Sequence, residues 1–258
     1  MTLDFANLMT VAALGLLIVL RVDARRFGAA DFDDETAISD WHIWMRRLTW
    51  YALGTVLVLA AYLVFPQPGA VLHLRLGDDR LFALMAGLSM ATLGVGAAVL
   101  YALLRFREVS LPVGRAYPVG LLNSVATAFI DEGAFRGILL GLLLFSNWPP
   151  LYAVAFQAVA YALATRLGGA GRPRSLLILW LVVGFLSGWL TYLTGGIGAA
   201  LLAHALTRFA IFVATGHAGQ ITPVAVSEEE AYELTEVAGD EGLEVVPDRE
   251  PGHLRPIE

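Results

Sequence analysis

Residues 123–144 read NSVATAFIDEGAFRGILLGLLL, an apolar stretch that carries three charged side chains at its centre. With its flanks, at 119–145, this stretch is long enough to cross a bilayer, which takes about 20 apolar residues in a helix. A charged side chain at that depth costs about 2.5–3.5 kcal/mol on insertion scales, so each such residue needs a reason. The stretch therefore predicts a membrane-spanning helix with an unusual charged midpoint.

The composition of the whole chain also indicates a membrane protein. Of its 258 residues, 57% are hydrophobic and 16% are charged, whereas a soluble domain has about 45–50% apolar and about 25% charged residues. No cysteine is present, which excludes disulfides and thiol chemistry. We predict an all-α integral membrane protein of about seven transmembrane helices, with the other spans at roughly 3–20, 48–66, 81–104, 151–166, 175–193 and 197–215.

The arginines between these spans predict the orientation of the chain. All 17 basic residues are arginine, and successive connections hold five, two, three, zero, three and zero of them. Because cytoplasmic connections are enriched in basic residues, the alternation places the N-terminus outside and the C-terminus in the cytoplasm. We expect a multi-pass protein of a bacterial plasma membrane. The first stretch is interpreted as a span rather than a signal peptide, because residues 1–7 contain no arginine.

The end of the chain has a different composition. Residues 217–258 hold eleven acidic residues and only two arginines, so they have little apolar surface to offset the entropy cost of ordering. We predict three regions: 1–117 with three N-terminal spans and cytoplasmic connections, 118–216 as the core, and 217–258 as an acidic, largely disordered cytoplasmic tail. A tail that docks a partner is the alternative.

The charged side chains within the spans should meet across facing helices. Glu132 and Arg136 are four residues apart, so they share a helix face and can pair. Asp131 is rotated by about 100° from Glu132 and needs a partner on another span. The last span offers His204 and Arg208 on one face, so we predict that these two side chains point at the charged span.

Two further patterns predict contacts between helices. Gln157, Tyr161 and Thr165 recur at four-residue spacing on the fifth span and form a polar stripe. Hydroxyl and amide side chains commonly join membrane helices by hydrogen bonds, which is the reading that we favour. The pairs Gly94/Gly96 and Gly184/Gly188 are predicted to allow close helix packing.

The charged span resembles a signature of the CPBP (Abi) family, which includes CAAX-type prenyl proteases and bacteriocin-processing membrane proteins. The first signature of that family is Glu-Glu-x-x-x-Arg within a span, and residues 131–136 read Asp-Glu-Gly-Ala-Phe-Arg. The third signature is His-x-x-x-Asn, and the last span contains His204 in an apolar helix of the right kind. The resemblance covers residues 118–216 and implies a four-helix CPBP-like core.

The resemblance implies an intramembrane endopeptidase that is metal-dependent or glutamate-assisted. A divalent metal such as zinc, held by Glu132 and His204, is implied only if the protein is active. Two positions depart from the family pattern: by spacing, Thr165 stands where the second signature has histidine, and Arg208 replaces the asparagine. The candidate catalytic residues that the resemblance implies are Asp131, Glu132, Arg136 and His204.

The count of charges favours a network without metal. Asp131 and Glu132 carry two negative charges, and Arg136 and Arg208 carry two positive ones. The four charges therefore sum to zero, and the cluster is balanced without a metal ion. We therefore predict a divergent family member that binds or stabilises a membrane protein or membrane-associated peptide and has weak or no peptidase activity. An active intramembrane metalloendopeptidase is the alternative, and a small transporter is a third reading. The bilayer is an expected partner, and nucleic acid is not.

Overall fold

The computed structural model divides into two compact units, Met1–Gln220 and Ile221–Glu258. In the second unit, β3 (Leu243–Val245) pairs antiparallel with β4 (Leu254–Pro256). The prediction of a disordered tail concerns residues that lie largely outside the described ones. The residues that the structure describes are 5–29, 32–33, 41–107, 109, 111–112, 114–168, 175–215, 217–218, 243–245 and 254–256.

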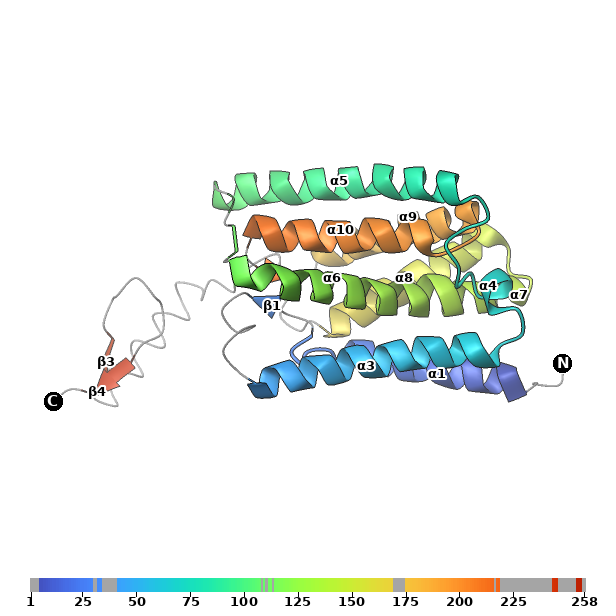
Figure 1. The fold of residues 1–258 in the computed structure, drawn as a ribbon, viewed down its shortest axis with the longest axis horizontal. Coiled ribbons are helices and arrows are strands. Elements are labelled where there is room, and N and C mark those ends of the chain that lie inside the picture. Colours follow the sequence, from blue (N-terminus) through green and yellow to red (C-terminus); the bar gives the residue numbers. More distant parts are fainter. Residues whose placement is uncertain are drawn as a thin grey trace. The chain divides into compact units, whose positions relative to one another are not determined.

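Helices make up nearly all of the described part of the first unit, which confirms the all-α prediction (Figure 1). Two short strands, β1 (Phe32–Asp33) and β2 (His217–Ala218), pair with each other. The longer helices are α1 (Phe5–Val22), α3 (Trp41–Val64), α5 (Arg80–Phe106), α6 (Tyr117–Asp131), α8 (Pro150–Gly168), α9 (Ser175–Thr194) and α10 (Gly198–Thr215). The shorter ones are α4 (Pro68–Val71), the 3₁₀ turn η1 (Gly114–Ala116), the π-helix η2 (Glu132–Leu139) and α7 (Leu140–Phe145).

About seven membrane crossings are present, as predicted. Within the described residues, six helices are long and apolar enough to span a membrane: α1, α3, α5, α8, α9 and α10. The seventh crossing is the predicted charged span, in which α6, η2 and α7 follow one another without a break. Its middle is π-helical rather than α-helical, so three helical elements replace one.

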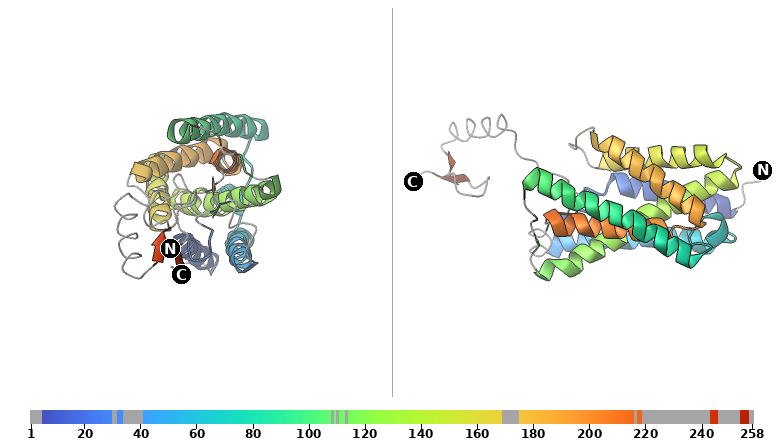
Figure 2. Two further views of the ribbon diagram at one scale, coloured as in Figure 1. Left: turned by 90° about the vertical axis from the view of Figure 1, so that its left-hand side faces the viewer. Right: turned by 90° about the horizontal axis from the view of Figure 1, so that it is seen from above.

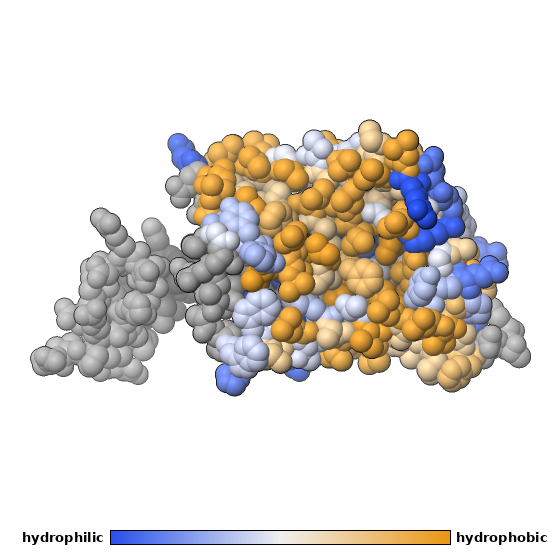
Figure 3. Space-filling model, in the orientation of Figure 1, coloured by the Kyte–Doolittle hydropathy of each residue, from blue (hydrophilic) through white to orange (hydrophobic). Residues whose placement is uncertain are grey.

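The outer surface of the first unit suits lipid rather than water. Figure 3 shows apolar residues over most of the visible face, with hydrophilic residues mainly toward its two ends. In α5 only 22% of the strongly apolar stretch within Arg80–Leu104 is buried inside the bundle. So large an exposed apolar area has no favourable contact in water, whereas a bilayer surrounds it with hydrocarbon. The protein is therefore a multi-pass membrane protein.

The helices are arranged around α6 and η2 (Figures 1 and 2). Helix α10 packs against α5 and α6, α8 packs against α9, and α1 packs against α3. Helix α1 also contacts α8 and η2. The pairing of β1 with β2 brings the segment after α1 to the segment after α10, at one end of the bundle.

A close contact between α5 and α10 depends on glycine. A Cβ atom added at Gly87 would lie 2.9 Å from the carbonyl oxygen of Ala199, and one at Gly94 would overlap the Thr207 side chain. A Cβ atom at Gly96 would meet nothing within 4 Å. The prediction of close packing is confirmed for Gly94 and is wrong for Gly96, which lies on another side of the helix.

These two environments predict opposite effects of adding a methyl group. Gly87→Ala should lower the free energy of unfolding by about 1–3 kcal/mol, because the backbone of α10 cannot move aside cheaply. Gly96→Ala should raise it by about 0.5–1 kcal/mol, because alanine loses less backbone entropy in a helix. Unfolding of both variants in the same detergent provides the measurement. Equal stabilities would contradict the close approach of α5 and α10.

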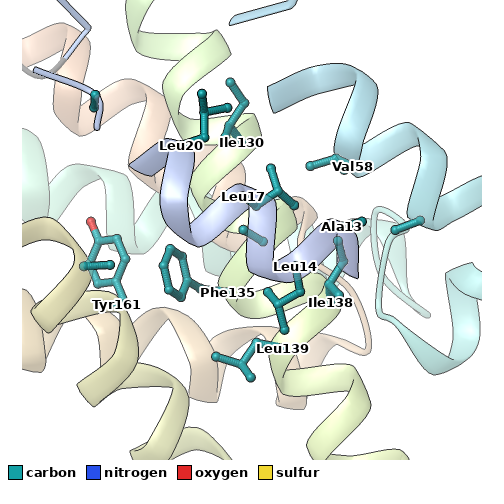
Figure 4. Close-up of a cluster of buried hydrophobic side chains, with 14 of the residues drawn as sticks. Ala13, Leu14, Leu17, Leu20, Val58, Ile130, Phe135, Ile138, Leu139 and Tyr161 are labelled. Atoms are coloured by element: carbon teal, nitrogen blue, oxygen red, sulfur yellow. The ribbon is translucent and has the colours of Figure 1, made fainter. Parts of the chain in front are cut away.

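The largest hydrophobic cluster holds the π-helix in place (Figure 4). Phe135 of η2 lies between α1 and Tyr161, and its ring meets that of Tyr161 edge to face at 5.4 Å. Leu17 of α1 and Ile138 of η2 are also fully buried in this cluster. Because lipid is as apolar as these side chains, van der Waals packing rather than the hydrophobic effect stabilises their contacts. The charged residues of η2 are thus fixed on a rigid element.

Candidate functional site

The site begins with two fully buried charged residues on the π-helix. Glu132 and Arg136 are both 0% exposed. Their helix packs tightly, because a Cβ atom at Gly133 would lie 2.9 Å from Val58 of α3. π-Helical segments are rare and frequently occur at functional sites. The buried charges and the irregular backbone coincide at one place in the membrane.

Glu132 has a partner on each side. The Nδ1 atom of His204 lies 2.7 Å from Oε1 of Glu132, and Nε of Arg136 lies 3.3 Å from its Oε2. The predicted pairing of Glu132 with Arg136 is confirmed, and so is the prediction that His204 faces the charged span. The guanidinium of Arg136 also lies 4.1 Å from the centre of the Tyr161 ring, a cation–π contact.

The partner of Asp131 comes from the first helix. Nε of Arg21 lies 3.0 Å from Oδ1 of Asp131, and its Nη2 donates to the Thr165 hydroxyl at 3.5 Å. The expectation that the partner of Asp131 comes from the last span is wrong, although His204 of that span does pair with the neighbouring carboxylate of Glu132. Arg21 is one of the five arginines of the first predicted connection, whereas α1 extends to Val22 and packs against η2 and α8. The only sequence signal was its position directly after the apolar stretch.

Arg208 belongs to a separate chain of hydrogen bonds. Its Nη2 donates to Oδ1 of Asn123 at 3.1 Å, and Nδ2 of Asn123 donates to the Tyr51 hydroxyl at 2.6 Å. Sequence reasoning missed Asn123, although it lies eight residues before Asp131 and the helix period places both on one face. With Arg21 included, the side chains around Asp131 and Glu132 hold three arginines against these two carboxylates, and Arg47 of α3 is buried as well. The predicted charge balance of two against two is therefore wrong.

The polar stripe on α8 is buried and makes contacts between helices. Nε2 of Gln157 donates to the Gly184 carbonyl of α9 at 2.8 Å. Thr165 accepts from Arg21, and the ring of Tyr161 lies beneath Arg136. The favoured reading of the stripe, hydrogen bonding between helices, is confirmed for Gln157 and Thr165.

The donor set does not fit a divalent metal. Within the described part of the chain, no three histidine, cysteine, aspartate or glutamate side chains come together to hold an ion. Glu132 and His204 are joined by a hydrogen bond, and Asp131 forms an ion pair with Arg21. Two guanidinium groups lie against these carboxylates and repel a second cation. The implied ligands Glu132 and His204 are adjacent, but their surroundings suit an ion-pair network.

His73 lies apart from this site, in the connection between α4 and α5. Its ring is mostly buried, and its carbonyl accepts a hydrogen bond from the Ile197 amide at 3.0 Å. Burial is the main cause that lowers the pKa of His73 below its ordinary value of 6.5. The charge of Arg75 lowers it further, whereas the Gly195 backbone and Asp78 oppose the shift.

The stability of the protein should therefore depend on pH through His73. Because the folded state favours the neutral ring, the unfolded chain binds the proton first as the pH falls. Stability should be constant above about pH 7.5, decline as the pH falls through 6.5 towards the lowered pKa, and then level off. His73→Asn suits the positive φ of 52° and should reduce the decline.

The measurement is thermal unfolding in detergent between about pH 8 and about pH 5. The matched control is His42→Asn, at an exposed position near the start of α3. An unchanged pH profile in His73→Asn would show that other groups cause the dependence.

The fold and the site together define a multi-pass membrane protein with a buried cluster of paired charges on an irregular helix. Residues 113–210 of this protein match the family model described as type II CAAX prenyl endopeptidase Rce1-like. The resemblance to the CPBP family, including its CAAX protease-like branch, is thereby confirmed for this segment. Comparisons with curated proteins and with solved structures found no significant match.

The matched segment does not include every residue of the site. Glu132, Arg136, His204 and Arg208 lie within residues 113–210, whereas Arg21 lies far outside them, on α1. The counter-charge of Asp131 is thus supplied by a part of the chain that the family model does not match.

Proposed function

We propose that the protein is a divergent CAAX protease-like membrane protein that binds or stabilises a membrane protein partner without hydrolysing it. The observation that carries this proposal is the pairing of both carboxylates. Glu132 is held by His204 and Arg136, and Asp131 is held by Arg21. All of these contacts lie within the buried core of the bundle.

Hydrolysis needs a carboxylate that is free to take a proton from water. A general base must lie within about 2.6–3.2 Å of the water that it activates. In this arrangement Glu132 must first release His204 or Arg136, and neither side chain has another carboxylate within 4 Å among the described residues. Breaking a buried pair costs about 3–5 kcal/mol, which adds directly to the barrier. The cluster is better suited to hold α1, η2, α8 and α10 together.

An active endopeptidase is the second candidate, and one observation favours it. The 2.7 Å contact between Glu132 and His204 joins a carboxylate and an imidazole, the two groups that general acid–base chemistry uses most. In this alternative Glu132 accepts the proton of the attacking water, and His204 stabilises the developing negative charge. Metal is not required for these roles.

A prenylated CAAX peptide with a fluorophore and a quencher separates the two candidates. We expect the purified wild-type protein to release no more fluorescence than Glu132→Gln does. We also expect Glu132→Gln to accumulate less in the membrane, because Arg136 then lacks a charged partner. A normally abundant Glu132→Gln variant that loses a clear wild-type cleavage activity would overturn the proposal and establish the endopeptidase.

We also propose that the C-terminus is cytoplasmic and the N-terminus external, which the distribution of arginines supports. The pairing of β1 with β2 supports one part of this, because the segments after α1 and α10 then share a side. Single cysteines at Ser146 and Ser227, in this cysteine-free chain, should react with impermeant reagents from opposite sides. Labelling of both from one side would contradict the seven-span topology.

A further inference from the structure

The buried core carries more positive than negative charge. Asp131 and Glu132 contribute two negative charges, and each is paired. Of the three arginines, Arg21 and Arg136 take part in those pairs. Among the described residues, no carboxylate lies within 4 Å of Arg208, so at least one positive charge in the core lacks a balancing charge.

The surplus charge is located where unused hydrogen-bond donors lie. Nε of Arg208 is buried and has no acceptor among the described residues, as is also true of Nε of Arg21 and of the three guanidinium nitrogens of Arg136, so what distinguishes Arg208 is the absence of a paired carboxylate. The Tyr51 hydroxyl accepts a hydrogen bond from Asn123, so its own proton remains to be donated. Helices α3, α6 and α10 thus bring a guanidinium and a phenol to one hydrogen-bonded chain. A site that binds a negatively charged oxygen needs a fixed positive charge and hydrogen-bond donors that have no other acceptor, and both are present here.

Arg208 is also the arginine that an outside group can reach. Arg136 is fully buried and Arg21 nearly so, whereas Arg208 is partly exposed on α10. An anion that approaches from the bilayer therefore meets Arg208 before the paired arginines. It can do so without disturbing the contacts of Glu132 or Asp131.

The depth of Arg208 favours a protein carboxylate over a lipid phosphate. Arg208 lies seven residues before the end of α10 at Thr215, which corresponds to about 10 Å along the helix axis. Its guanidinium is held at this depth by Asn123, which lies six residues after the start of α6. Lipid phosphates lie outside the hydrocarbon core of about 30 Å, so a phosphate would have to sink well below its usual level.

We propose that Arg208, together with Tyr51, binds the side-chain carboxylate of an aspartate or glutamate within a membrane-spanning helix of a partner protein. This inference rests on the proposed function, because it states the chemistry by which a partner is recognised. Intramembrane acidic residues pair with basic ones because the bilayer offers no other compensation. The partner is thus a helix with one acidic residue near mid-membrane.

The experiment uses two synthetic helices of about 20 leucine and alanine residues that differ only in a central glutamate or glutamine. Each is reconstituted with the full-length protein in phosphatidylcholine vesicles, and association is measured by energy transfer to a dye on a cysteine introduced at Ser146. We expect the glutamate helix to associate about tenfold more tightly with the wild-type protein, as a charge-assisted hydrogen bond provides. In Arg208→Gln this preference should disappear.

Matched variants test the assignment to Arg208. Arg80→Gln removes an exposed arginine at the start of α5 and should keep the preference. Tyr51→Phe removes one donor and should reduce the preference without abolishing it. Arg208→Gln should accumulate in the membrane like the wild type, because the remaining charges balance. Failure of this variant to accumulate would contradict the surplus of charge and overturn the proposal.

Three other outcomes would also overturn it. The first is equal binding of the two helices to the wild type, and the second is a preference that persists in Arg208→Gln. The third is loss of the preference when phosphatidylglycerol is added, which would assign Arg208 to a lipid phosphate. Cleavage of the CAAX peptide that depends on Glu132 would instead overturn the proposed function alone, because the binding preference is measured independently.

Discussion

Replacement of Arg21 by glutamine should lower the free energy of unfolding by about 3–5 kcal/mol, because it leaves the buried Asp131 without a counter-charge. Thr165 loses a hydrogen-bond partner in the same change. A loss of that size is a large part of the stability of a typical protein. The amount of protein in the membrane and its thermal unfolding in detergent should therefore both decrease clearly.

A control and a rescue make this prediction specific. Arg25→Gln changes an exposed arginine four residues further on and should have little effect. Arg21→Gln combined with Asp131→Asn removes both charges and should be more stable than Arg21→Gln alone, since a lone buried charge costs more than an absent pair. A double variant no better than the single one would mean that Arg21 acts through packing instead.

Replacement of Arg136 by glutamine should have an effect of similar size, about 3–5 kcal/mol. Glu132 would then keep only His204, and the contact of the guanidinium with the Tyr161 ring would be lost. Both the carboxylate and the guanidinium are fully buried, so water cannot take over either contact. Unfolding in detergent, with membrane abundance as a second readout, measures the loss.

Tyr161→Phe is the matched control for Arg136→Gln. It keeps the aromatic face below Arg136 and the edge-to-face contact with Phe135. We therefore expect a loss of less than about 1 kcal/mol from this variant. A loss as large as that of Arg136→Gln would show that the hydroxyl of Tyr161, not its ring, supports the cluster.

The prediction for Arg21 depends on the position of α1. Helix α1 lies outside residues 113–210, yet it contacts η2 and α8 and contributes Arg21 to the core. Arg208 is not the counter-charge of Asp131, because Arg21 has that role.

The sequence by itself determined the class of protein and which charged residues lie within the membrane-spanning helices, except for Arg21. Length and apolarity are local properties, so each span could be predicted separately from its own stretch of chain. The pairing of Glu132 with Arg136 was equally predictable, because the two lie within one turn of one helix. The contact of His204 with the charged span was also predictable, because a helix face that carries Arg208 would be costly to expose to lipid.

Only the tertiary structure decided which arginine meets which carboxylate. Arg21 and Arg208 both lie on helices remote in sequence from Asp131, and helix periodicity carries no information about which helices become neighbours. The packing of α1 against η2 and α8 brings Arg21 to Asp131, whereas Arg208 donates to Asn123. The apolar pattern of residues 119–145 predicted a regular helix, so the π-helical backbone at Glu132–Leu139 came only from the tertiary structure.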